Sequence, residues 1–198
     1  MQESPELQKL TKLLAQFPGL GPRSAKRMIL HMLTHKNDLM RPLAAAIDAA
    51  AVAIQECTTC GNLDTCNPCN LCSNERRDKS TICIVQGVAD IWALERTRSY
   101  YGQYHVIGGL LSALDGVKPA DLKINSLTER VQTNDIQEII IALPATVDGQ
   151  STGHYIQKQL GECSAQITKL AHGVPVGGEL DYLDDGTLSL ALKSRGKA

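Results

Sequence analysis

Four cysteines between residues 57 and 72 have the spacing of a metal-binding site. They form two Cys-x-x-Cys pairs, Cys57 with Cys60 and Cys69 with Cys72, which eight residues separate. Two such turns can present four thiolates to one tetrahedral ion. A closed shell of four thiolates leaves no position for water or substrate, so the predicted ion has a structural role. We expect one structural zinc ion per chain; the alternative is a set of buried free thiols.

A fifth cysteine offers a second way to pair the ligands. Cys66 and Cys69 also have Cys-x-x-Cys spacing. In a metal-binding knuckle, the amides two and three residues after the first cysteine point at its sulfur. Pro68 lies two residues after Cys66 and has no amide hydrogen, so Cys69 and Cys72 form the better pair. Two further cysteines are predicted to be thiols that bind no metal: Cys83 and Cys163.

A glycine-rich turn near the amino terminus precedes a group of basic residues. Within the run Phe17 to Arg23, Gly19 and Gly21 permit backbone conformations that are closed to other residues. The helix expected after this turn begins with unpaired amides, which can receive a phosphate. Its first turns carry three cations: Arg23, Lys26 and Arg27. This combination favours a contact to nucleic-acid backbone that is independent of base sequence. The alternative is a plain helix–turn–helix linkage with exposed basic residues.

Helices are expected on both sides of this turn. From Ser4 to Gln16, apolar residues recur at three- and four-residue spacing, with Ser4 as the cap and Pro5 opening the helix. A second apolar set follows the turn, from residue 25 to residue 33. A third helix is expected from about residue 38 to residue 55, with Pro42 in its first turn. One face of this third helix is apolar.

The pattern changes after Ser80 to short apolar runs that alternate with helical segments. Strands are expected at residues 81–86, 104–107, 136–143 and about 166–170, and helices at 88–96 and 152–160. This alternation predicts βα units and a mostly parallel sheet, so the fold class is α/β. A glycine-rich stretch at 174–178 leads into an expected turn and strand that end the fold.

The composition is that of an ordinary globular protein. Hydrophobic residues make up 43% and charged residues 21% of the 198 residues, which is too apolar for a disordered chain. No basic start is followed by an apolar run, and no apolar stretch is long enough to span a bilayer. We therefore expect a cytoplasmic location and no membrane partner. In that compartment cysteines are metal ligands or buried thiols more often than disulfides.

Charge is distributed unevenly along the chain. The net charge is −1, but residues 1–36 carry six basic residues and two glutamates, a net charge of +4, and the rest of the chain has −5. A basic arm on an acidic body indicates phosphate binding at one end and protein contacts at the other. The alternative is that these charges only solvate helix faces.

The order of these parts resembles the RecR family of bacterial recombination mediators. A helix-hairpin-helix motif with its glycine-hydrophobe-glycine turn, the cysteine cluster, the run Thr81 to Glu95 and the run Val174 to Leu180 follow one another over essentially the whole chain. The resemblance implies a helix-hairpin-helix DNA-binding region at 1–56, a four-cysteine zinc finger at 57–72, a Toprim domain at 80–175 and a C-terminal segment at 176–198 with oligomer contacts. It also implies zinc ligands and DNA-contacting residues at these positions: Cys57, Cys60, Cys69 and Cys72 for zinc; Gly19, Gly21, Arg23, Lys26 and Arg27 for DNA.

Enzymes with a Toprim domain provide the main alternative. Topoisomerases and primases of this fold hold magnesium with a glutamate and a later pair of aspartates. Gln86 stands at the glutamate position here, and the loop after the 136–143 strand contains Asp148 but no Asp-x-Asp pair. A neutral amide is a poor magnesium ligand, and one carboxylate cannot organise two-metal phosphoryl chemistry. We therefore expect no catalysis.

The resemblance implies a non-enzymatic role in recombinational DNA repair. Such a protein acts with RecF and RecO to place RecA on gaps coated by single-strand-binding protein. It forms a homo-oligomer, a dimer or a ring tetramer, with DNA passing through a central hole. Two other function classes are a magnesium-dependent Toprim nuclease or topoisomerase, and a zinc-stabilised scaffold that contacts only proteins. Salt-sensitive DNA binding distinguishes the mediator from the scaffold.

Overall fold

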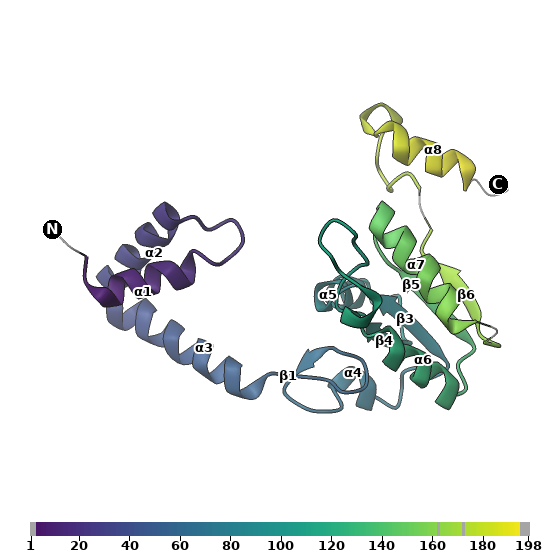
Figure 1. Cartoon of the computed structure of the whole chain (residues 1–198), viewed down its shortest axis with the longest axis horizontal. Coiled ribbons are helices and arrows are strands. Elements are labelled where there is room, and N and C mark those ends of the chain that lie inside the picture. Colours follow the sequence, from purple (N-terminus) through teal and green to yellow (C-terminus); the bar gives the residue numbers. More distant parts are fainter. Residues whose placement is uncertain (1–2, 162, 172, 195–198) are drawn as a thin grey trace. The chain divides into compact units, whose positions relative to one another are not determined.

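The chain divides into two compact units, Met1–Ile54 and Gln55–Ala198. The structure, a computed structural model, describes residues 3–161, 163–171 and 173–194, and most of its helices and strands are labelled in Figure 1. Among the described helices, none combines the length and the apolar character that crossing a bilayer requires.

The amino-terminal unit is helical. Its elements are α1 (Pro5–Leu14), α2 (Pro22–Thr34), a π-helical turn (Lys36–Met40) and α3 (Arg41–Ala53). The Ser4 hydroxyl accepts a hydrogen bond from the Leu7 amide at 3.4 Å, and Pro5 is the first helical residue. Both features confirm the predicted start of α1. Serine satisfies a free amide of the first turn, and proline at the first position has no amide hydrogen that would need a partner.

A small core joins α1 and α2. Three residues on one side of α2 are buried: Ala25, Ile29 and Met32. The buried residue of α1 is Thr11, whose hydroxyl donates to the Leu7 carbonyl at 2.7 Å. The polar atom of Thr11 is therefore satisfied within its own helix.

The third helix differs from the prediction in its ends and in its burial. It begins at Arg41 after the π-helical turn and ends at Ala53, so Gln55 is extended. None of its residues is buried, and Ile47 is 62% exposed. The periodicity correctly indicated an apolar face, but a pattern does not reveal whether the surface that covers it belongs to the same chain.

A four-stranded parallel sheet is the centre of the carboxy-terminal unit. The strands β3 (Thr81–Val85), β4 (Gln103–Val106), β5 (Glu138–Ala142) and β6 (Gln166–Lys169) lie in the order β4-β3-β5-β6. Ile84 of β3 lies opposite His105 of β4 on one side and Ile141 of β5 on the other. The parallel pairing confirms the predicted α/β class.

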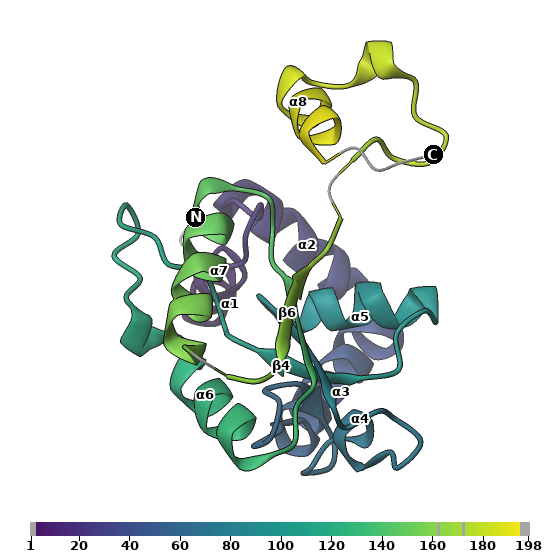
Figure 2. The same ribbon diagram turned by 90° about the vertical axis from the view of Figure 1, so that its right-hand side faces the viewer.

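Helices cover both faces of this sheet, as Figure 2 shows. One face packs on α5 (Val88–Thr97) through a cluster that includes Cys83, Val85 and Tyr104. The other face packs on α6 (Ile124–Thr133) and α7 (Val147–Leu160) through a larger cluster centred on the β3 and β5 isoleucines. A sheet that is buried on both faces requires apolar side chains at successive positions, which is why its strands appear in the sequence as continuous apolar runs.

Short elements complete the carboxy-terminal unit. They are β1 (Gln55–Glu56) and β2 (Leu63–Asp64), which pair antiparallel, α4 (Asn70–Ser73), and the 3₁₀ turns η2 (Pro119–Asp121) and η3 (Leu180–Tyr182). The last element is α8 (Asp185–Lys193). The prediction of a strand after the glycine-rich stretch is therefore wrong, because η3 and α8 follow that stretch. Asp184 caps α8 by accepting a hydrogen bond from the Thr187 amide at 2.9 Å, and this cap favours a helix over a strand.

Candidate functional site

The structure brings Cys57, Cys60, Cys69 and Cys72 together, and their sulfur atoms all lie within 4.8 Å of one another. The Sγ atoms of Cys57 and Cys72 are 3.9 Å apart, and those of Cys60 and Cys69 are 3.5 Å apart. A tetrahedron with metal–sulfur bonds of 2.3 Å has edges of about 3.8 Å. The four cysteines therefore have the spacing to hold one metal ion.

Backbone amides surround the Cys57 sulfur. The Cys69 amide donates to this sulfur at 3.3 Å, and the amides of Thr59 and Cys60 also bond to it. Burial raises the pKa of Cys57, but these three amides, together with a hydrogen bond from the Cys60 thiol, outweigh burial and bring the pKa to about 6. The amides two and three residues after Cys57 thus act as the knuckle geometry requires.

The remaining sulfurs cannot all ionise without a cation. A hydrogen bond with the Cys72 sulfur, and then burial, raise the pKa of Cys60, although the Asn62 amide donates to its sulfur at 3.4 Å. Four thiolates within 4.8 Å would repel one another strongly. A divalent ion removes this repulsion, so the chemistry of the donor set fits a bound metal.

The other described cysteines lie outside this group. Cys66 is half-buried and is not among the four clustered thiols. Cys83 lies in β3, where burial, and then the nearby charge of Asp90, raise its pKa to about 12. Cys163 donates only a weak hydrogen bond, at 3.9 Å, to the Ala165 carbonyl. The four clustered cysteines are thus the four candidate ligands that the spacing indicated, and the three other cysteines are not among them.

The first knuckle contacts the edge strand of the sheet. The Cys60 carbonyl accepts a hydrogen bond from the Val106 amide of β4 at 2.8 Å. Gly61, with φ of +77°, lies so close to Val106 that an added Cβ would be 3.1 Å from its side chain. A guanidinium nitrogen of Arg130 donates to the carbonyls of Tyr104 at 2.6 Å and Thr59 at 3.4 Å. The cysteine cluster is therefore fixed to the edge of the four-stranded sheet.

In the amino-terminal unit, a tight turn joins α1 to α2. Gly19 has φ of +75°, and the Leu20 amide donates to the Phe17 carbonyl at 3.1 Å. Gly21 is the N-cap of α2, and no side chain of a described residue bonds the free amides of the first turn. An anion can therefore approach these amides without displacing a capping group.

The three basic residues of this helix are exposed, but they are not equivalent. Lys26 forms an ion pair with Glu3 at 2.7 Å. Arg23 and Arg27 form no ion pair with any residue that the structure describes, and with Ser24 they line a shallow hollow. The two arginines are thus the cations best placed to hold an anion at this end of α2.

In the part of the chain that the structure describes, no group of three or more carboxylates gathers at the carboxyl edge of the sheet. Gln86, which follows β3, is neutral, and the Asp90 carboxylate accepts a hydrogen bond from the Gly87 amide at 2.8 Å as part of the start of α5. Asp148 lies in the first turn of α7. Among the described residues, the four-cysteine cluster is the one group of three or more metal-binding side chains. Four thiols do not suit magnesium, which takes oxygen ligands.

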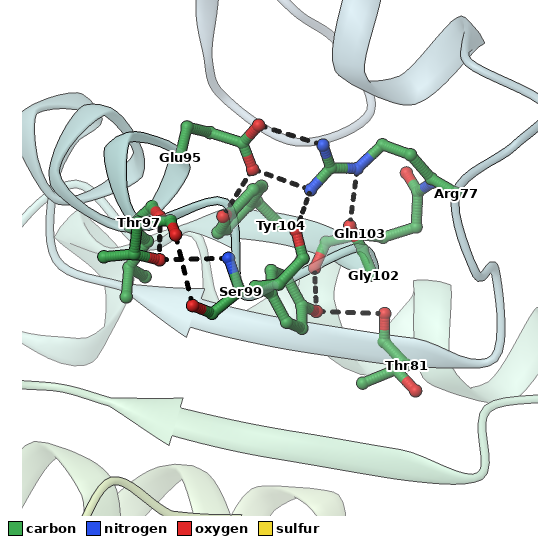
Figure 3. Close-up of polar contacts among 10 residues, drawn as sticks. Arg77, Thr81, Glu95, Thr97, Ser99, Gly102, Gln103 and Tyr104 are labelled. Atoms are coloured by element: carbon green, nitrogen blue, oxygen red, sulfur yellow. Dashed lines mark hydrogen bonds and ion pairs between the residues drawn. The ribbon is translucent and has the colours of Figure 1, made fainter.

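One arginine, Arg77, is buried although nothing in the surrounding sequence indicates it (Figure 3). The side chain of Arg77 is 7% exposed, and its two terminal nitrogens donate to both carboxylate oxygens of Glu95 at 3.0 and 2.7 Å. Its Nε donates to the Gly102 carbonyl at 2.8 Å, and the Tyr104 hydroxyl donates to Glu95 at 2.7 Å. Burial opposes ionisation of Glu95, but the bonds from Arg77 and Tyr104 lower its pKa. Arg77 lies in a charged segment, Asn74 to Lys79, which resembles an exposed loop in the sequence.

Comparison with known proteins covers nearly the whole chain. A model described as the RecR helix-hairpin-helix matches residues 7–51, a Toprim domain model matches residues 80–171, and a RecR C-terminal model matches residues 173–195.

Relatives from several bacteria agree with these matches. "Recombination protein RecR" of Bradyrhizobium sp. (strain ORS 278) is 56% identical over 191 residues, which are 96% of either chain. The protein of the same name from Bartonella quintana (strain Toulouse) is 56% identical over 96% of this chain and 95% of its own. The one from Brucella anthropi is 53% identical over the same shares. With its helix-hairpin-helix, four-cysteine cluster and Toprim sheet in this order, the chain belongs to the RecR family of recombination proteins.

Proposed function

We propose that this protein is a DNA-binding mediator of recombinational repair that has no enzymatic activity of its own. The observation that carries the proposal is the start of α2, where uncapped amides adjoin two unpaired arginines, Arg23 and Arg27. Such a surface binds phosphate groups and takes no information from the bases, so it suits a protein that acts at any sequence. Gly19 and Gly21 shape the turn, and Lys26 contributes when DNA displaces Glu3.

The DNA contact is tested by removing both arginines. Arg23→Ala with Arg27→Ala lowers the affinity for a fluorescent duplex at least about tenfold, because each exposed charge contact contributes about 0.7 kcal/mol or more. The matched control is Lys36→Ala with Arg41→Ala, which removes the same charge beyond the other end of α2. Equal affinities of the two variants would refute this assignment of the site.

We infer that the ion in the cysteine cluster is zinc, one per chain. Four thiolates in tetrahedral spacing are a usual structural zinc site. The ligands are Cys57, Cys60, Cys69 and Cys72, and the metal stabilises a segment with little core of its own. This role agrees with a cytoplasmic location, where thiols stay reduced.

We infer that the protein acts as a homo-oligomer, a dimer or a ring tetramer. Leu43, Ile47 and Ile54 recur at helical spacing along α3 and its end, and they are 41%, 62% and 47% exposed. An apolar face of this kind needs a cover, and a second copy supplies it. Ile47→Asp is expected to lower the mass measured by light scattering. Ala45→Asp, on the opposite face of α3, leaves the mass unchanged.

We propose that the carboxy-terminal unit binds the partner proteins. Residues 55–198 have 13 basic and 17 acidic side chains, a net charge of −4, which complements a basic partner surface. The family resemblance points to RecO and RecF as direct partners, with RecA and single-strand-binding protein acting on the same DNA gap. The test is whether purified RecO increases DNA binding by this protein.

The Toprim sheet is the feature that favours an enzyme instead. Gln86 and the single Asp148 support the non-enzymatic proposal, because they do not provide the carboxylates for phosphoryl transfer. Magnesium-dependent nicking or relaxation of plasmid DNA by the purified protein would favour the enzyme.

A further inference from the structure

A surface beside α5 combines exposed aromatic and basic side chains. Trp92, the only tryptophan of the chain, is 62% exposed, and Tyr101 is 65% exposed. Arg96, Arg98 and Lys79 are also exposed, and none of them forms an ion pair with a described residue. These five residues are called the α5 surface below.

Helix geometry and the Arg77 network connect the backbone segments that carry these side chains. Trp92 and Arg96 are four residues apart in α5, so they lie on one side of this helix, next to Glu95. Glu95 binds Arg77, which also holds the Gly102 carbonyl (Figure 3). The loop that carries Tyr101 is therefore fixed to the end of α5.

The same network fixes the basic residues. The Asp78 amide donates to the Tyr101 carbonyl at 2.8 Å, which places Lys79 beside the loop. Arg98 has φ of +53° and caps the end of α5, while the Ser99 amide donates to the Thr97 hydroxyl at 3.2 Å. The backbone on which these side chains stand is thus held by hydrogen bonds.

The charge of this surface differs from that of its unit. Residues 75–79 and 92–101 contain five basic and three acidic side chains, a net charge of +2, whereas the whole unit has −4. Arg77 pairs with Glu95. Four basic and two acidic side chains remain in these two stretches, so the charge outside that pair is mainly positive.

We propose that the α5 surface binds single-stranded DNA, with bases stacked on Trp92 and Tyr101 and phosphates held by Arg96, Arg98 and Lys79. Aromatic faces interleaved with cations suit a single strand, whose bases are free to stack, better than a duplex, whose bases are already paired. The site consists of other residues than the arginines of α2. The inference rests on the proposed function only in assuming that this protein binds DNA.

The single tryptophan provides a direct test. In an Arg23→Ala, Arg27→Ala background, an oligonucleotide of about 16 deoxythymidines quenches Trp92 fluorescence to saturation, and a duplex of equal length does not. By anisotropy of labelled oligonucleotide, Trp92→Ala weakens binding about 5- to 160-fold, which corresponds to the loss of one stacked base, and Trp92→Phe retains most of the affinity. This background keeps the result independent of the contact proposed at α2.

Charge reversal tests the phosphate contacts. Arg96→Glu with Arg98→Glu reduces the slope of log affinity against log salt by about 1.4, if each arginine meets one phosphate of a single strand. Lys158→Glu with Lys169→Glu is the matched control on α7 and β6, and it leaves binding of the single strand nearly unchanged. Unchanged Trp92 fluorescence, or equal effects of the two charge reversals, would overturn the proposal and leave this face to a protein partner.

Discussion

Replacing Arg77 by methionine is expected to destabilise the folded protein by about 3 kcal/mol. Arg77→Met keeps most of the side-chain volume but removes two bonds to Glu95 and one to Gly102, each 3.0 Å or shorter. Loss of one partner of a buried ion pair costs roughly 3–5 kcal/mol. The Glu95 side chain is 31% exposed, so water can solvate it in part, and the lower end of this range applies.

Urea unfolding of the zinc-loaded protein measures this change at pH 7. Arg76→Met is the matched control, because Arg76 is exposed and forms no ion pair with a described residue; it changes the free energy of unfolding by less than about 0.5 kcal/mol. The pKa of Glu95 is lowered in the folded state, so the pair stabilises the protein above the unfolded-state pKa of about 4.3. The difference between wild type and Arg77→Met therefore shrinks as the pH falls through the lower folded-state value. A loss below about 1 kcal/mol at pH 7 would show that the network contributes little.

Two further pairs of substitutions, each with its control, test the cysteine cluster and the start of α7. Cys60→Ser lowers both the zinc content and the melting temperature, whereas Cys66→Ser lowers neither; a full equivalent of zinc in Cys60→Ser, by elemental analysis, contradicts the ligand assignment. Gly149→Ala destabilises the protein by about 2 kcal/mol or more, because the added Cβ would overlap the Pro144 carbonyl. The control Gly153→Ala, in the same helix, is neutral or stabilises by about 0.5–1 kcal/mol. Thermal melts that rank the two variants in the reverse order contradict this expectation.

Features with a local cause could be predicted from the sequence. Ser4 and Pro5 fix the start of α1 through their own hydrogen bonding and ring geometry. Because Pro68 has no amide hydrogen, the sequence favoured Cys69 with Cys72 over Cys66 with Cys69, and Cys66 is not among the four clustered cysteines. Apolar runs identified the four strands, because a sheet covered on both faces leaves little room for polar side chains.

Features with a distant cause could not be predicted. Arg77 is buried because Glu95 and the loop around Gly102 enclose it, and no local pattern in its charged segment indicates that. The short helix α6 was missed because seven of its ten residues are polar and its three buried residues suffice to cover the sheet. The apolar face of α3 was recognised, but its exposure within the chain depends on a surface that the sequence does not specify.

The salt dependence of DNA binding tests the central claim most directly. We expect wild-type protein to bind duplex DNA with an affinity that falls steeply as the salt concentration rises, because basic side chains that bind the phosphates displace condensed counterions. The Arg23→Ala, Arg27→Ala variant should bind more weakly, with a slope smaller by about 1.8 for each start of α2 that contacts the duplex. An unchanged affinity and slope in this variant would contradict the claim that the helix-hairpin-helix contacts DNA.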